Sequence, residues 1–152
     1  MALRNALYLC LMQRGYTLTE LALVCTIVGV ILALAVPRTA GWIDKLAVLR
    51  ATEDFRGFYQ RARMGAVYRS SRVRITIGPD SLIAVAEGQT DSVLAQRPGP
   101  SKYGVSVEVS RSVIRLYPTG IGLGGANTSV LLRRGAVAVS LTISRLGRLR
   151  QL

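Results

Sequence analysis

The sequence contains no histidine, two cysteines and eight acidic residues among its 152 positions. The absence of histidine excludes metal sites built on imidazole and catalytic triads in which histidine activates a serine. Cys10 and Cys25 both precede Pro37. No disulfide can therefore crosslink residues 37–152, and cysteine usage does not indicate a redox compartment.

The few carboxylates do not suggest catalysis. Beyond residue 70 they are Asp80, Glu87, Asp91 and Glu108, scattered among expected turns and strands with no evident pair for general acid–base chemistry. We therefore expect no enzymatic activity, and neither a metal nor a cofactor.

Three glycines match a nucleotide-binding pattern by letter only. Gly120, Gly122 and Gly125 satisfy G-x-G-x-x-G, but a dinucleotide site requires a helix N-terminus directly after the glycines. The residues that follow predict an apolar strand at 130–132. We interpret the segment as a flexible loop.

Basic residues dominate the charge. The chain has 20 lysines and arginines and a net charge of +12. Two of the basic residues and one of the acidic residues precede Pro37, so residues 37–152 carry 18 basic and 7 acidic groups, a net charge of +11. An excess of this size favours a polyanionic partner such as nucleic acid.

The longest apolar run is residues 21–36, which contain no charged side chain and end at Pro37. Counted from Tyr16, the run is long enough, at about 30 Å of helix, to cross the hydrocarbon core of a bilayer. Glu20 lies near its start, where a carboxylate inside a membrane is costly without a partner. Cleavage after Gly15 would create such a partner, the free amine of Tyr16.

These residues resemble the N-terminal signal of type IV pilins and type II secretion pseudopilins. That signal has a basic residue and glycine before the cut, an aromatic first mature residue, glutamate at mature position five, and an apolar helix closing at proline. Here the matching residues are Arg14, Gly15, Tyr16, Glu20 and Pro37. An ordinary signal anchor that happens to carry a glutamate is the alternative.

The resemblance implies a processing and assembly route. A prepilin peptidase would cut between Gly15 and Tyr16, and the Tyr16 amine would be N-methylated. Sister pilins or pseudopilins would pack through the apolar helix, with Glu20 neutralising a neighbouring N-terminal amine. Before assembly the chain would cross the inner membrane once, with its N-terminus cytoplasmic and its C-terminal domain periplasmic.

The leader, residues 1–15, is unusual because its middle is apolar. A start at Met12 would give the compact basic leader Met-Gln-Arg-Gly. We interpret Met12 as the true start, and a 15-residue leader is the alternative.

The remaining chain predicts an α+β fold, a pilin-like long N-terminal helix packed on a C-terminal antiparallel β-domain. We expect a transmembrane helix segment at 16–37, an amphipathic helix half at 38–69 and a β-rich domain at 70–152. The helix is predicted from apolar residues spaced three or four apart. These are Ile43, Ala47, Ala51, Phe55, Phe58, Ala62 and Ala66, with Leu46 and Tyr59 beside them.

Beyond residue 70 the pattern changes to alternation, which is typical of strands. Strands are predicted at 73–77, 82–86, 105–109, 113–117, 130–132 and 137–139, with 141–143 extending the last. Residues 87–101 are expected to form an exposed loop, and residues 144–152 a basic tail.

Five arginines gather near the C-terminus. Arg145, Arg148 and Arg150 follow the last predicted strand, and Arg133 and Arg134 lie in the hairpin before it. The guanidinium fork suits phosphate oxygens, so these arginines are candidates for contacting a nucleic-acid backbone. A solvated basic edge, or a surface that meets acidic neighbours in a filament, is the alternative.

The C-terminal half is similar to the GspH/FimT branch of the pseudopilins. The similarity rests on an aromatic-Pro-x-Gly turn at residues 117–120 and on Gly147-Arg148-Leu149-Arg150 near the end. Resemblance to the FimT-type minor pilins implies binding of double-stranded DNA during natural transformation. GspH-type members imply a structural minor pseudopilin near the tip of a type II secretion pseudopilus, with no nucleic-acid role. Both functions stay open from the sequence.

Overall fold

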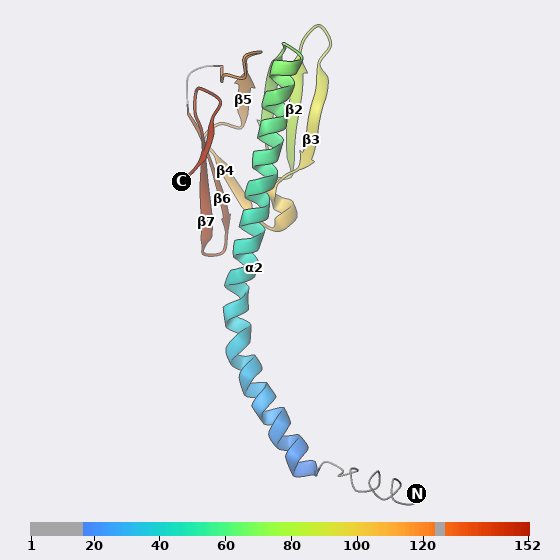
Figure 1. Cartoon of the computed structure of the whole chain (residues 1–152), viewed down its shortest axis with the longest axis vertical. Helices are drawn as coiled ribbons and strands as arrows, with labels where there is room; N and C mark the ends of the chain where they lie inside the picture. The colour runs from blue at the N-terminus through green and yellow to red at the C-terminus, as the bar shows by residue number, and fades with distance from the viewer. Residues whose placement is uncertain (1–16, 124–126) are drawn as a thin grey trace, which may run out of the picture. The chain divides into compact units, whose positions relative to one another are not determined.

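A computed structural model describes residues 17–123 and 127–152, without the side chains of 35–40. The chain divides into two compact units, residues 1–39 and 40–152. Its elements are α2 (Leu18–Tyr68), β1 (Arg72–Ile77), β2 (Ser81–Glu87), β3 (Ser92–Pro98), the short 3-10 helix η1 (Pro100–Tyr103), β4 (Ser106–Val109), β5 (Val113–Leu116), β6 (Thr128–Arg134), β7 (Val137–Ile143) and β8 (Leu149–Gln151) (Figure 1).

The first unit contains the beginning of α2, which Thr17 caps. The Glu20 amide donates to the Thr17 carbonyl at 3.0 Å and to its hydroxyl oxygen at 3.2 Å, as expected of threonine at this position. All side chains of residues 17–34 are exposed. Among the residues that the structure describes, no helix reaches the length and hydropathy of a membrane span. Of the predicted span 16–37, Tyr16 and the side chains of 35–37 lie outside that description.

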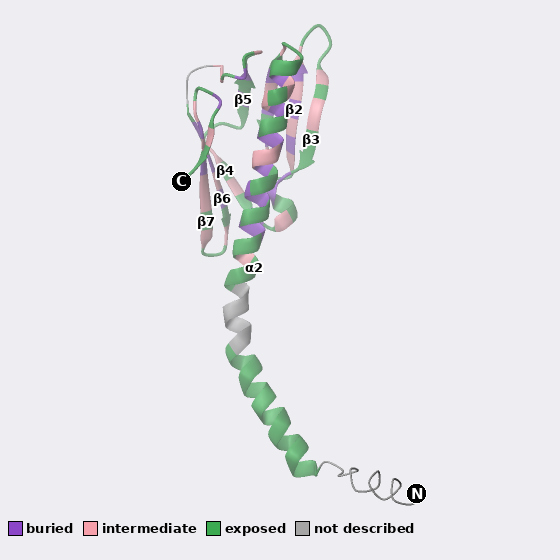
Figure 2. Ribbon diagram, viewed as in Figure 1, coloured by how far each residue is buried: buried purple, intermediate pink, exposed green. Residues whose placement is uncertain are grey.

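In the second unit α2 buries one face (Figure 2). The residues of the predicted stripe from Ala47 to Ala66 are all buried, and Tyr59 with them. The prediction was wrong for Ile43 and Leu46, which are 56% and 50% exposed. These two side chains line an open cleft beside η1 instead of entering the core.

Two four-stranded antiparallel sheets complete the second unit. Their strand orders are β3-β2-β1-β5 and β4-β6-β7-β8. Alternation places one face of each inner strand in the core, so that β1 buries Val73, Ile75 and Ile77. One hydrophobic cluster joins these strands to the buried face of α2. The α+β prediction of a long N-terminal helix on an antiparallel β-domain is confirmed.

Two segments differ from the predictions. The expected loop 87–101 contains β3, which pairs with β2 through Ala84 and Ala95, and also η1. β3 is an edge strand with mostly exposed or half-buried residues, so it needs no regular apolar alternation. The expected tail 144–152 contains β8, which pairs with β7 through Ile143 and Leu149.

Candidate functional site

The C-terminal hairpin, which we define as β7, β8 and the turn between them, carries three of the predicted arginines. Arg145, Arg148 and Arg150 are all exposed. Among the described residues, none of the three has a carboxylate within salt-bridge distance. Their charges are therefore available to a partner.

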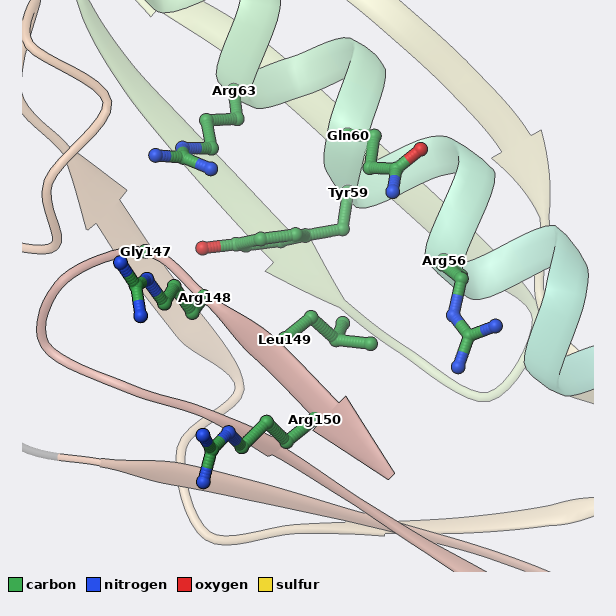
Figure 3. Close-up of a pocket in the computed structure, with 8 residues that line it drawn as sticks. All are labelled: Arg56, Tyr59, Gln60, Arg63, Gly147, Arg148, Leu149 and Arg150. Atoms are coloured by element: carbon green, nitrogen blue, oxygen red, sulfur yellow. The ribbon is translucent and has the colours of Figure 1, made fainter.

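Hydrogen bonds fix the turn that presents these arginines. The Ser144 amide donates to the Arg148 carbonyl at 2.8 Å, and the Gly147 amide donates to the Ser144 carbonyl at 2.9 Å. Gly147 takes a φ of 72°, the left-handed position that ends a common class of short hairpin loop. Leu149, the first residue of β8, packs against the core, and the side chains of Arg148 and Arg150 extend in the opposite direction from that of Leu149 (Figure 3).

Arg133 and Arg134 lie at the other end of β7. They end β6, whereas the turn with Arg145 follows the far end of β7. β7 has seven residues and is therefore about 20 Å long. The structure thus separates the five predicted arginines into a group of two and a group of three.

Arg134 is also engaged within the fold. Its Nε donates to Asp44 Oδ1 at 2.8 Å, and its Nη1 donates to the Tyr103 carbonyl. Arg133 is exposed. Of the pair, Arg133 is the better placed for an outside partner.

Beside the C-terminal hairpin lies a cleft of about 340 Å³, which we call the arginine cleft. Its lining residues come from α2 and from the hairpin (Figure 3). They are Arg56, Tyr59, Gln60, Arg63, Gly147, Arg148, Leu149 and Arg150. The four helix residues among them were not predicted as site residues from the sequence. Their spacing of three to four residues, which places them on one helix face, was the available signal.

Arg63 joins the two C-terminal motifs. Its Nε donates to the Gly120 carbonyl at 3.1 Å, and Gly120 closes the aromatic-Pro-x-Gly turn. A Cβ on Gly147 would lie 2.2 Å from the Gly120 carbonyl oxygen and 3.2 Å from Arg63 Nε. Only glycine at position 147 allows the hairpin to approach so closely. The contact places the Gly147–Arg148 turn next to the Arg63 side chain.

Tyr59 contributes a buried hydroxyl. The residue is 1% exposed, and its oxygen has no hydrogen-bond partner among the residues that the structure describes. Burial raises the pKa of Tyr59, and the nearby Arg63 charge lowers it by less. The hydroxyl therefore remains a proton donor at neutral pH. It points into the space between Arg63 and the Gly147–Arg148 turn (Figure 3).

Arg56, at the other end of the arginine cleft, is partly neutralised. Its Nη1 lies 3.0 Å from Glu53 Oε1, and its Nη2 donates to Gln151 Oε1 at 3.4 Å. Within the described chain, Arg63 has no such carboxylate. The unpaired positive charge is therefore concentrated around Arg63, Arg148 and Arg150.

The predicted processing site lies largely outside the described residues. Gly15 and Tyr16, the expected cleavage and methylation positions, both fall there. Glu20 is described, as an exposed residue in the first turn of α2. An acid there is favoured by the helix dipole.

Comparison with solved structures relates the fold to pilins. A crystal form of the type IV minor pilin FimU from Pseudomonas aeruginosa PAO1 aligns with a TM-score of 0.61 and 16% identity, over 71% of this chain and 90% of that one. A second crystal form aligns with a TM-score of 0.57 and 16% identity, over 68% and 91%. The minor pseudopilin EpsH from the type 2 secretion system of Vibrio cholerae gives 0.47 at 16% identity, over 67% and 95%.

Comparison of the sequence with protein-family profiles identifies the family. No curated protein sequence matches the chain. The profile of the type II transport protein GspH matches residues 51–147, from the buried face of α2 to the glycine of the C-terminal hairpin. Because this match spans more than half of the chain, the protein belongs to the GspH family of minor pilins and pseudopilins.

Proposed function

We propose that the chain is a minor pilin or pseudopilin subunit that enters a filament through the N-terminal part of α2. The observation that carries this proposal is the full exposure of residues 17–34. Ten large apolar side chains are exposed there, and Glu20 is the single charged residue. An apolar surface of this extent is typical of a protein or membrane contact.

The proposed route begins in the inner membrane. A prepilin peptidase cuts between Gly15 and Tyr16, the new Tyr16 amine is methylated, and the globular unit lies on the periplasmic side. In the filament Glu20 pairs with the N-terminal amine of a neighbouring subunit. Away from water such a pair is strongly favoured over a lone carboxylate.

Substitution of Glu20 tests the assembly step. We expect Glu20→Ala to be cleaved normally but to be lost from sheared filaments, because the neighbouring amine has no counter-charge. Glu53→Ala is the matched control, since Glu53 is an exposed glutamate of the same helix whose ion-pair partner in the described part of the chain is Arg56. Normal incorporation of Glu20→Ala would contradict the proposal.

A second function, binding of double-stranded DNA without sequence preference, is favoured by the C-terminal hairpin. Three exposed arginines lie there on a turn that backbone hydrogen bonds hold in place. None of them forms an ion pair with a carboxylate in the described chain. Arg133, at the far end of β7, offers a separate contact to a long duplex. A structural pseudopilin with no nucleic-acid role is the competing function.

A salt titration separates these two functions. Three phosphate contacts predict a log–log slope of about −2.7, at roughly −0.9 per phosphate released from its counterions. Arg148→Ala/Arg150→Ala should flatten the slope by about two. Arg97→Ala is the control, because Arg97 is an exposed arginine on the edge strand of the other sheet. If neither the wild type nor any variant binds the duplex at low salt, the DNA-binding function is refuted and the structural pseudopilin is the remaining function.

A further inference from the structure

We infer that the arginine cleft is a seat for one phosphate group, bound by the Tyr59 hydroxyl and the Arg63 guanidinium, with Arg148 at its rim. If the phosphate belongs to a nucleic-acid backbone, the inference that this phosphate-binding site, or seat, is used rests on the DNA binding proposed above. The inference that the seat binds a phosphate group depends only on the residues of the arginine cleft. The seat adds two helix residues to a surface that otherwise consists of the C-terminal hairpin.

The first observation is the unpaired hydroxyl of Tyr59. Buried tyrosine hydroxyls usually have a partner, and a buried donor without one carries a desolvation cost. Tyr59 is 1% exposed, and no described residue accepts its proton. A ligand oxygen in the cleft would accept it.

The second observation is the fixed guanidinium of Arg63. The side chain is half-buried, and its Nε bond to the Gly120 carbonyl at 3.1 Å holds it in place. Its remaining donors have no carboxylate partner in the described chain. A partly buried charge without a counter-charge is costly, so an anion is the expected occupant.

The donor set favours phosphate as that anion. An O–H group and a guanidinium approach from α2 and the rim arginine from the C-terminal hairpin, and phosphate offers several oxygens to such donors. None of the described residues that line the cleft is acidic. Its volume of about 340 Å³ is within the range of small-molecule sites. A phosphate with part of a sugar would fit.

The sharpest test is Tyr59→Phe in the full chain, purified in neutral detergent. The substitution removes only the unpaired oxygen, so the variant should unfold no more readily than the wild type. We expect its affinity for a labelled DNA duplex to fall about tenfold, the value of one hydrogen bond to a charged group. Because the hydroxyl carries no charge, the salt slope should stay unchanged. Tyr68→Phe is the control, as Tyr68 is 91% exposed.

A second variant and a second probe separate the seat from DNA binding as such. Arg63→Gln should weaken duplex binding and also flatten the slope by about 0.9. Inorganic phosphate, compared with chloride at equal ionic strength, should raise the melting temperature of the wild type but not of Tyr59→Phe. That phosphate result without any duplex binding would support the seat and refute the DNA function.

Two results would overturn the inference. Wild-type affinity of Tyr59→Phe for both duplex and phosphate would remove the seat, even if Arg148→Ala/Arg150→Ala abolished DNA binding. Tyr59-dependent binding of an acidic peptide, with no response to phosphate or duplex, would assign the cleft to a protein partner instead.

Discussion

Gly147→Ala is expected to damage both the fold and the presentation of the arginines. The new Cβ would lie 2.2 Å from the Gly120 carbonyl oxygen, which belongs to backbone and cannot rotate away. Position 147 also has a φ of 72°, which costs a side-chain-bearing residue about 1–2 kcal/mol. Overpacking adds about 1–3 kcal/mol. The free energy of unfolding should therefore fall by about 2–5 kcal/mol.

A second glycine-to-alanine substitution provides the matched control. Gly57 lies inside α2, and a Cβ there would meet no described atom within 4 Å beyond its chain neighbours and the backbone of its own helical turns. Gly57→Ala should stabilise the protein by about 0.5–1 kcal/mol through its higher helix propensity. Urea denaturation followed by circular dichroism compares the two. DNA affinity should fall only for Gly147→Ala, although neither variant changes the charge. If Gly147→Ala is as stable as the wild type, the close contact between the Gly147 turn and the Gly120 turn is refuted.

Two further substitutions have effects that follow from the contacts described. Asp44→Ala removes the partly exposed partner of Arg134 and should lower the free energy of unfolding by about 1 kcal/mol, with Glu108→Ala as a control carboxylate. The pKa of Tyr59 is raised in the folded protein above its usual value of 10. Between these two pKa values Tyr59 ionises in the unfolded chain but not in the folded one, so the wild type should lose stability as the pH rises from about 10 through the folded-state pKa. Tyr59→Phe lacks this loss, and denaturation curves at roughly pH 9 and pH 11 should show the difference between the two proteins growing in favour of the variant.

The sequence predicted those parts of the fold that depend on periodic burial. The stripe from Ala47 to Ala66 is regular because one face of α2 meets the core. β1 alternates because only one of its faces is buried. β3 was missed because an edge strand needs little burial. β8 was missed because three residues are too few to show a period.

The arginine cleft was less accessible to prediction, because it depends on tertiary contacts. Arg63 and Gly147 are distant in sequence, and no local pattern shows that they meet through Gly120. Tyr59 was correctly expected near the core stripe, but periodicity cannot show that its hydroxyl has no partner. Arg133 is close to Arg145 in sequence, yet β7 separates them. The Gly-Arg-x-Arg resemblance pointed to residues 147–150 as candidates, but it gave no sign that they lie in a hairpin rather than a tail.

The most direct test of the central claim is mass spectrometry of the mature protein recovered from membranes or filaments. A subunit that assembles through a processed N-terminal helix should begin at Tyr16 and carry one methyl group on its amine. Intact mass and the N-terminal peptide would establish both features. A mature protein that retains residues before Tyr16, or begins elsewhere, would contradict the account.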